Sequence, residues 1–99
     1  MDRNIPDNVI YISRTRPLTD YVIPVMSIYN SGAERIIVKS RGSCNNSNLS
    51  LSQYLMNKAM RNMLKIAKVD VWTEQLKINE QKTINVTCLA VIYERSDHE

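Results

Sequence analysis

The sequence predicts a single α/β domain in which a mixed sheet carries a long C-terminal β-hairpin arm. Its 99 residues allow one domain, with 43% hydrophobic and 23% charged residues. Two β-branched segments alternate with segments of helical periodicity, and near residue 69 the hydrophobic period changes from about 3.6 to 2. The expected order is therefore β-α-β-α-β-β, with a parallel start because helices connect the first strands.

The first strand and helix are predicted over residues 9–32. Residues 9–12 (Val-Ile-Tyr-Ile) are β-branched or aromatic and indicate a buried strand. Pro17 suits a first helical position, and Gly32 suits a C-terminal cap. Pro24 predicts a kink near residues 20–24 because a proline inside a helix removes a hydrogen bond. The apolar helix face consists of Leu18, Tyr21, Val22, Val25 and Tyr29.

The second strand and helix are predicted over residues 35–64. Residues 35–39 (Arg-Ile-Ile-Val-Lys) indicate another buried strand, and residues 41–43 a loop. Helical spacing over residues 48–64 gives a wide apolar sector. Core packing explains most of it, and a subunit interface could explain its methionine edge. The sector consists of Leu51, Leu55, Met56, Ala59, Met60, Met63 and Leu64.

The last two strands are predicted to form a long antiparallel hairpin. Alternating patterns at residues 69–74 and 84–92 flank a turn at residues 79–81. Near Leu89, Val91 and Tyr93 both faces of the last strand are apolar. We therefore expect that strand to be covered on both sides, with a second subunit as one cover.

Charge divides the chain into three parts. Residues 1–7 and 94–99 together hold five acids and two bases, whereas residues 8–93 hold eleven bases and five acids. We expect a disordered N-terminal segment (1–7), one domain (8–93) and an acidic C-terminal tail (94–99). A basic body favours a polyanionic partner, most often nucleic acid, although lysines and arginines also simply solvate a surface.

Several function classes lack support in the sequence. No apolar run is long enough to span a membrane, and no secretory signal pattern begins the chain. The single histidine, His98, lies in the polar tail, the two cysteines are too few for a cysteine-only zinc site, and neither glycine belongs to a phosphate loop. We therefore expect no catalytic residue, metal, cofactor, small-molecule substrate or membrane partner, and an intracellular location in the nucleus, on chromatin or in the cytoplasm.

The basic residues form the candidate site. Two pairs follow the first two strands, whose carboxyl ends meet at one sheet edge if they are parallel. Two lysines flank the hairpin tip, and any one of these cations could equally serve only to keep a loop soluble. Trp72 and the five tyrosines could stack on bases, but their strand and helix positions favour core packing. The predicted nucleic-acid-binding residues are Arg14, Arg16, Lys39, Arg41, Lys77 and Lys82.

Three segments together resemble the Alba family of small DNA/RNA-binding proteins. They are residues 8–12 (Asn-Val-Ile-Tyr-Ile), 16–22 (Arg-Pro-Leu-Thr-Asp-Tyr-Val) and 39–42 (Lys-Ser-Arg-Gly). The resemblance implies a two-layer α/β sandwich that forms a homodimer, or a heterodimer with a related chain, and binds DNA or RNA mainly through backbone contacts. It also implies that Thr15 and Arg16 correspond to the family's lysine pair in the turn after the first strand. Arg41 then corresponds to the arginine of the family's Lys-x-Arg-Gly motif at the end of the second strand.

The sequence departs from the family pattern at two places. The first turn is one residue longer and has Thr15-Arg16 where the family has a lysine pair, so acetylation has no substrate at those positions. Residues 43–47 (Ser-Cys-Asn-Asn-Ser) replace bases that are common in archaeal members. Their polar groups could hydrogen-bond nucleotides or shape the loop, and we interpret them as favouring a eukaryotic-type member that binds RNA.

The expected function is binding of DNA or RNA by a dimer, largely independent of sequence, without enzymatic activity. Sequence preference should be weak because no recognition helix for the major groove is evident. The alternative is a scaffold subunit of a ribonucleoprotein that works mainly by heterodimerising with a paralogue. Charge reversal at Arg16 and Arg41 should abolish nucleic-acid binding in the first case and spare assembly in the second.

Overall fold

The computed structural model describes residues 8–96, which follow the predicted order β-α-β-α-β-β. The segment 1–7 and residues 97–99 of the predicted tail, including His98, lie outside the described residues. The elements are β1 (Val9–Tyr11), a 3-10 turn (Leu18–Tyr21), α1 (Val22–Asn30), β2 (Arg35–Arg41), α2 (Cys44–Tyr54), a π-helical turn (Leu55–Ala59), β3 (Leu64–Asn79) and β4 (Lys82–Arg95).

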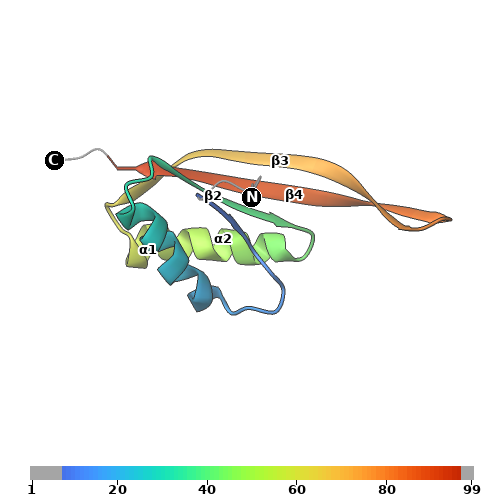
Figure 1. The fold of residues 1–99 in the computed structure, drawn as a ribbon, viewed down its shortest axis with the longest axis horizontal. Helices are drawn as coiled ribbons and strands as arrows, with labels where there is room; N and C mark the ends of the chain where they lie inside the picture. Colours follow the sequence, from blue (N-terminus) through green and yellow to red (C-terminus); the bar gives the residue numbers. More distant parts are fainter. Residues whose placement is uncertain (1–7, 97–99) are drawn as a thin grey trace, which may run out of the picture.

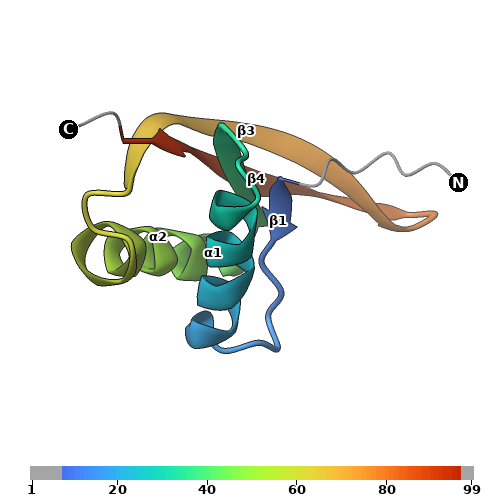
Figure 2. The ribbon, with the colours of Figure 1, turned by 60° about the vertical axis from the view of Figure 1, so that its left-hand side comes forward.

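The four strands form one mixed sheet in the order β1-β2-β4-β3, with α1 and α2 on one side of it (Figures 1 and 2). β1 and β2 are parallel, and the other neighbours are antiparallel, as predicted. β2 pairs with β4 as far as Arg41 and Cys88, whereas β3 and β4 remain paired beyond that point. Residues 73–87 therefore extend past the sheet as the hairpin arm, and the molecule measures 56 Å along its longest axis.

The core lies between the helices and the central strands. Leu51 and Leu55 are fully buried and pack with the inward residues of β2 and β4. β4 is buried on both faces, as its apolar pattern predicts, but the reason is its central position. Leu89, Val91 and Tyr93 lie in the core, while on the other face Cys88 and Ala90 are short side chains at the level of the sheet. No second subunit is needed to explain this burial.

The first helical segment differs from the single kinked helix that the sequence predicts. A 3-10 turn ends at Tyr21, and α1 begins at Val22, so the irregularity near residues 20–24 is a change of helix type. Pro24 is the third residue of α1, where a backbone N–H would have no partner within the helix, so the proline costs no hydrogen bond there. Gly32 follows α1 with a φ of 94°, as its predicted capping role requires.

The second helix begins earlier and ends earlier than predicted. α2 starts at Cys44, because two asparagine amides in its first turns bind the sheet. The Asn45 amide donates to the carbonyl of Thr87 (2.9 Å), and the buried Asn48 amide donates to the carbonyl of Val38 (3.0 Å). After the π-helical turn the chain reverses, and Leu64 already belongs to β3.

β4 also continues beyond the predicted domain boundary at residue 93. Glu94 and Arg95, which the sequence assigns to the acidic tail, are strand residues. The Arg95 guanidinium donates to the carbonyls of Tyr29 (2.8 Å) and Ala33 (3.2 Å) and lies 3.9 Å from the centre of the Tyr29 ring. Arg95 thereby joins the end of β4 to the end of α1.

Candidate nucleic-acid interface

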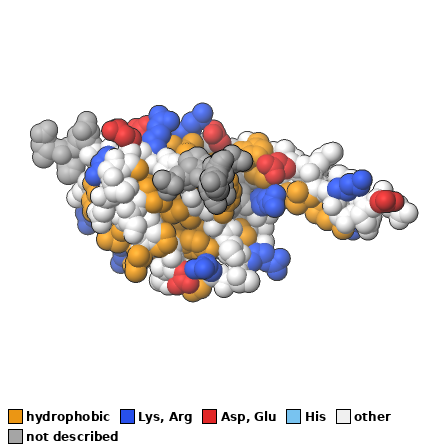
Figure 3. All heavy atoms as spheres, in the orientation of Figure 1, with side chains coloured by type: hydrophobic (Ala, Val, Ile, Leu, Met, Phe, Trp, Pro, Cys, Tyr) orange, Lys and Arg blue, Asp and Glu red, His pale blue; other side chains and the backbone are white. Residues whose placement is uncertain are grey.

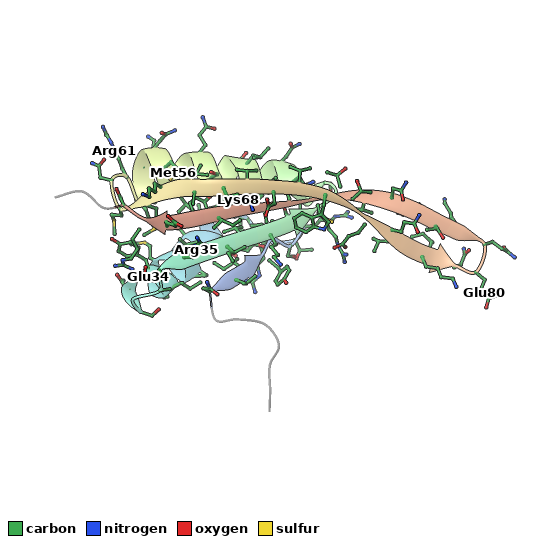
Figure 4. The ribbon with its side chains drawn as sticks, turned by 90° about the horizontal axis from the view of Figure 1, so that it is seen from above. Glu34, Arg35, Met56, Arg61, Lys68 and Glu80 are labelled. Carbon is green, nitrogen blue, oxygen red and sulfur yellow. The ribbon has the colours of Figure 1, made fainter. Side chains whose placement is uncertain are left out.

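The sheet face away from the helices carries an alternating set of charged and aromatic side chains, which we call the open sheet face. Register defines it: Arg41, Cys88 and Trp72 are cross-strand neighbours, and their strand neighbours Ser40 and Leu89 point to the helix side. Figure 4 views the molecule from this face. Its members are Val9, Tyr11, Arg35, Ile37, Lys39, Arg41, Lys65, Lys68, Asp70, Trp72, Glu74, Cys88, Ala90, Ile92 and Glu94.

A hollow of about 310 Å³ lies at the end of the open sheet face where β1 and β2 stop. Cys88 on β4 is short and buried, whereas Tyr11 on β1 is 54% exposed and Trp72 on β3 is half-buried. The depression forms because the side chains of β4 are short here, whereas those on the neighbouring strands are long. Its lining is Tyr11, Ile12, Lys39, Ser40, Arg41, Trp72 and Cys88.

Glu74 organises the charges at the rim of this hollow. Its carboxylate accepts hydrogen bonds from the Trp72 indole N–H (3.1 Å) and from the Arg41 guanidinium (3.4 Å). The indole hydrogen bond, with a contribution from Arg41, lowers the pKa of Glu74, so the carboxylate is ionised at neutral pH. Burial, with the neighbouring Glu74 charge, raises the pKa of the Cys88 thiol, which stays protonated.

Lys39 and Arg41 lie beside the hollow, as the end of a parallel strand pair predicts. The Lys39 ammonium is 5.9 Å from the centre of the Tyr11 ring, in a cation–π arrangement. Arg41 is the last residue of β2 and not part of a loop, and Gly42 makes the turn into α2 with a φ of 61°. Both cations therefore belong to a rigid sheet end.

Arg14 and Arg16 occupy the exposed loop after β1. The Ile12 N–H donates to the Lys39 carbonyl (2.9 Å), so the loop leaves the sheet beside the end of β2. The Ser13 N–H then donates to the Tyr21 hydroxyl (2.7 Å), and the loop descends to the helix layer (Figure 1). The two predicted pairs thus lie at the same end of the domain. Lys39 and Arg41 are on the open sheet face, and Arg14 and Arg16 are in the loop that runs from the sheet to the helix layer. Arg16 forms a 4.0 Å ion pair with Asp20.

Lys77 and Lys82 are exposed near the tip of the hairpin arm, as predicted. Lys77 pairs in register with Thr83, and Lys82 with Asn79. Figure 3 shows both basic and acidic side chains on the arm, and Glu80 lies at its tip (Figure 4). The arm is therefore a mixed polar projection with two cations close to its end.

Sequence reasoning missed cations that share a face with Lys39 and Arg41. Arg35 forms a 3.0 Å ion pair with Glu94, and Lys68 a 3.6 Å pair with Asp70. Alternation along β2 and β3 indicates which residues of each strand share a face. It shows that these cations lie on the face of Lys39 and Arg41 only when the register between the strands is known. Among the polar residues after Gly42, Asn45 donates to the Thr87 carbonyl of β4, which agrees with the alternative that these residues shape the segment.

Residues 8–96 lack two further features, a membrane-spanning helix and a metal-binding cluster. In this part of the chain no helix has the length and apolar content that a membrane crossing needs. The same residues hold no group of three or more histidine, cysteine or acidic side chains placed to bind a metal ion.

Comparison with known proteins gives consistent results from sequence and from structure. No family model matches the chain. The DNA/RNA-binding protein Alba of Methanocella arvoryzae is 24% identical over 89 residues, which cover 90% of this chain and 91% of the relative. The protein of the same name from Methanoculleus marisnigri is 26% identical over 88 residues, which cover 89% and 93%.

Solved structures show the same fold. Alba from Thermoplasma volcanium superposes with a TM-score of 0.78 at 25% identity and covers 89% of this chain and 100% of its own. ALBA1 from Trypanosoma brucei superposes with a TM-score of 0.75 at 14% identity, over 95% of this chain and 74% of its own. At this low identity the likeness is evidence of a shared fold only. Sequence and fold together confirm that this chain is Alba-like, with the fold of the Alba family and a sequence about a quarter identical to archaeal Alba proteins.

Proposed function

We propose that the protein binds DNA or RNA as a dimer, without catalysis, through the cations at one end of its sheet and on its hairpin arm. The main support is that the basic segments share one end of the molecule, where β1 and β2 stop. They are the end of β2 with Lys39 and Arg41, the β1–α1 loop, and the hairpin arm that extends beyond this end. The names of the archaeal relatives support the binding of DNA or RNA. It would be exercised in the nucleus, on chromatin or in the cytoplasm.

The ion pairs at this end are compatible with phosphate binding. Arg16–Asp20 and Arg41–Glu74 are exposed pairs with N–O distances of 4.0 and 3.4 Å. Exposed pairs of this kind contribute about 0–1 kcal/mol, so either arginine can turn to a phosphate at little cost. Such contacts position a protein on the backbone but carry no sequence information.

Binding should be largely independent of sequence. Both α1 and α2 pack against the sheet, so among residues 8–96 no helix projects to enter a major groove. The available groups are strand-end cations and a narrow hairpin, which follow the shape and charge of a backbone.

Dimerisation is supported by an uncovered apolar row on the helix side of β3. Val69 and Val71 pair in register with the core residues Val91 and Leu89, yet they are 48% and 64% exposed because no helix covers this edge of the sheet. Leu49, exposed on α2, shares a helix flank with Asn45, which binds β4. The apolar row, defined as Ile66, Val69, Val71 and Leu49, fits a second copy or a related chain.

Charge reversal tests the proposed binding site. Arg16→Glu with Arg41→Glu should abolish binding of duplex DNA and of RNA, measured by fluorescence anisotropy at matched salt. Lys58→Glu with Arg61→Glu makes the same change in charge at two exposed positions shortly before β3 and should bind normally. Arg61 lies near the opposite end of the sheet (Figure 4). Unchanged binding by the first variant would contradict this function and favour the ribonucleoprotein scaffold.

A further inference from the structure

We propose that the hollow on the open sheet face binds an unpaired nucleobase, stacked on Trp72, with Tyr11 as a second stacking surface for a neighbouring base. The inference rests on the proposed function and extends it. It makes single-stranded nucleic acid a ligand that the protein holds by its bases as well as by its phosphates.

Four of the six aromatic residues fall into two contrasting groups, while Tyr29 packs beside the core and Tyr54 is exposed on α2. Tyr21 and Tyr93 are buried in the core. Tyr11 and Trp72 instead lie on the open sheet face, which no described element covers, and both line the same hollow. Burying an aromatic ring stabilises a fold strongly, so rings left at the surface around a hollow indicate a binding role.

The sheet geometry separates these two rings by enough to admit bases. Tyr11 is on β1 and Trp72 on β3, with β2 and β4 between them. Three strand spacings of about 4.8 Å separate β1 from β3 by roughly 14 Å. Tyr11 lies level with Asp70, so the two aromatic residues are also offset by two residues along the strands. The floor between them at Cys88 is low, so both side chains border the depression, with Lys39 over one face of the Tyr11 ring. Aromatic side chains on the uncovered face of a four-stranded sheet are a general platform for stacking bases.

Cations lie where the phosphates of a stacked strand would run. Lys39 and Arg41 line the hollow between the two aromatic residues. Glu74 holds Trp72 and Arg41 at once, through the indole N–H at 3.1 Å and the guanidinium at 3.4 Å. One carboxylate therefore contacts both the stacking ring and a phosphate-binding group, and the exposed Arg41 pair leaves that guanidinium free to turn to a phosphate.

A duplex cannot use this site without unpairing, because its bases are stacked on each other. A single strand can lay one base in the hollow, and base–aromatic stacking tolerates any sequence because every base has a flat face. The site is thus compatible with weak sequence preference and predicts a difference between single strands and duplexes.

The fluorescence of Trp72, the single tryptophan of the chain, reports this contact directly. The wild-type protein is titrated with an unstructured RNA decamer, with single-stranded DNA of the same sequence, and with the corresponding DNA and RNA duplexes. We expect single strands to quench Trp72 at saturation and duplexes to bind without quenching. The two single-strand titrations show whether RNA or DNA is preferred.

Variants then measure the contribution of stacking. Trp72→Ala and Tyr11→Ala should each weaken single-strand binding about tenfold or more at fixed salt, with little effect on duplex affinity and no change in the salt slope. Trp72→Phe should restore most of the affinity. Tyr54→Ala, an exposed aromatic residue on α2 away from the hollow, is the matched control and should bind as the wild type. Circular dichroism verifies the fold of each variant.

Two results would overturn the base site. One is unchanged Trp72 fluorescence at saturating single strand, and the other is wild-type single-strand affinity in the folded Tyr11→Ala protein. Either result, with duplex binding still abolished by Arg16→Glu and Arg41→Glu, leaves the proposed function intact. Absence of any nucleic-acid binding by the wild type refutes both proposals.

Discussion

Arg95 shows how much one side chain contributes to the assembly of this fold. Its guanidinium donates to the carbonyls of Tyr29 and Ala33 and stacks on the Tyr29 ring. Tyr29 lies in the last turn of α1 and Ala33 beyond its end, where the helix dipole favours a positive charge; the Tyr29 carbonyl also accepts from the Gly32 N–H (3.1 Å). The contact joins the helix layer to the central strand across more than 60 residues of sequence.

Arg95→Met should therefore destabilise the protein. Methionine keeps the apolar stem but removes two charge-assisted hydrogen bonds, and we expect a loss of about 1–3 kcal/mol in the free energy of unfolding. Urea unfolding monitored by circular dichroism measures it. Arg61→Met, at an exposed turn position, is the control and should change the free energy by less than about 0.5 kcal/mol. Equal stability of the two variants would refute the anchoring role.

At the residue scale, the sequence predicts where the cations are but not what they contact. Lys39 and Arg41 were placed at the end of β2 from the strand pattern alone. Glu74, the partner of Arg41, is 33 residues away and meets it only through the pairing of β2 and β3 with β4. Asp20 is different, because its i+4 spacing from Arg16 was visible in the sequence.

At the scale of the elements, β4 is a central strand of the sheet, and two of its side chains, Cys88 and Tyr93, have raised pKa values. Burial raises the pKa of Tyr93, although the Ser52 hydroxyl offsets part of the shift, and burial together with Glu74 raises the pKa of Cys88. A thiol or phenol with a raised pKa in the folded state contributes stability below its unfolded-state pKa. That stability is lost as the pH rises through the folded-state value.

Stability should accordingly fall at alkaline pH, starting at about pH 8.5–9 with the thiol and continuing above about pH 10 with the phenol. The urea midpoint, measured from pH 7 to pH 11, should decrease over this range. Tyr93→Phe and Cys88→Ala should each show a smaller decrease relative to their own values at pH 7. A midpoint that stays constant to pH 11 would contradict the burial of both groups.

Element order, the parallel start and the hairpin turn were predictable because alternation and helical spacing are local signals. The N-terminus of α2 was not, since Ser-Cys-Asn-Asn-Ser after Gly42 is typical of a loop. Asn45 and Asn48 become helical because their amides find partners on β2 and β4, which only the folded sheet supplies. The boundary of β4 was missed for a similar reason, because the partners of Glu94 and Arg95 lie on other elements.

At the scale of the whole molecule, we propose two partners for three surface regions. Nucleic acid is the proposed partner of the open sheet face and the hairpin arm, and a second chain is the proposed partner of the apolar row on the helix side of β3. The methionine edge that the sequence pointed to is a weaker argument for dimerisation, because Met60 is fully buried in the core. The exposed side chains of Val69 and Val71 on β3 are the better evidence for dimerisation.

Val71→Asp should convert the dimer to a monomer. We expect the wild type to have twice the 11.4 kDa mass of one chain in light scattering at tens of micromolar, with an interface of at least about 1,000 Å². An aspartate in the apolar row leaves a buried, unpaired charge in that interface. Ile23→Asp, at a 72% exposed position on α1, is the control and should remain dimeric. A monomeric wild type would contradict the proposed assembly.

The dependence of nucleic-acid affinity on salt tests the central claim, electrostatic binding at the end of the sheet, most directly. Six candidate cations per subunit, of which about three to five reach phosphates, predict a log–log slope of roughly −3 to −5 on duplex DNA, since each contact releases about 0.9 of a counterion. The slope should be shallower on single-stranded RNA, and Arg16→Ala should reduce it by about one unit without altering sequence preference. Binding that does not vary with salt, or a slope unchanged by neutralising both Arg16 and Arg41, would contradict the account.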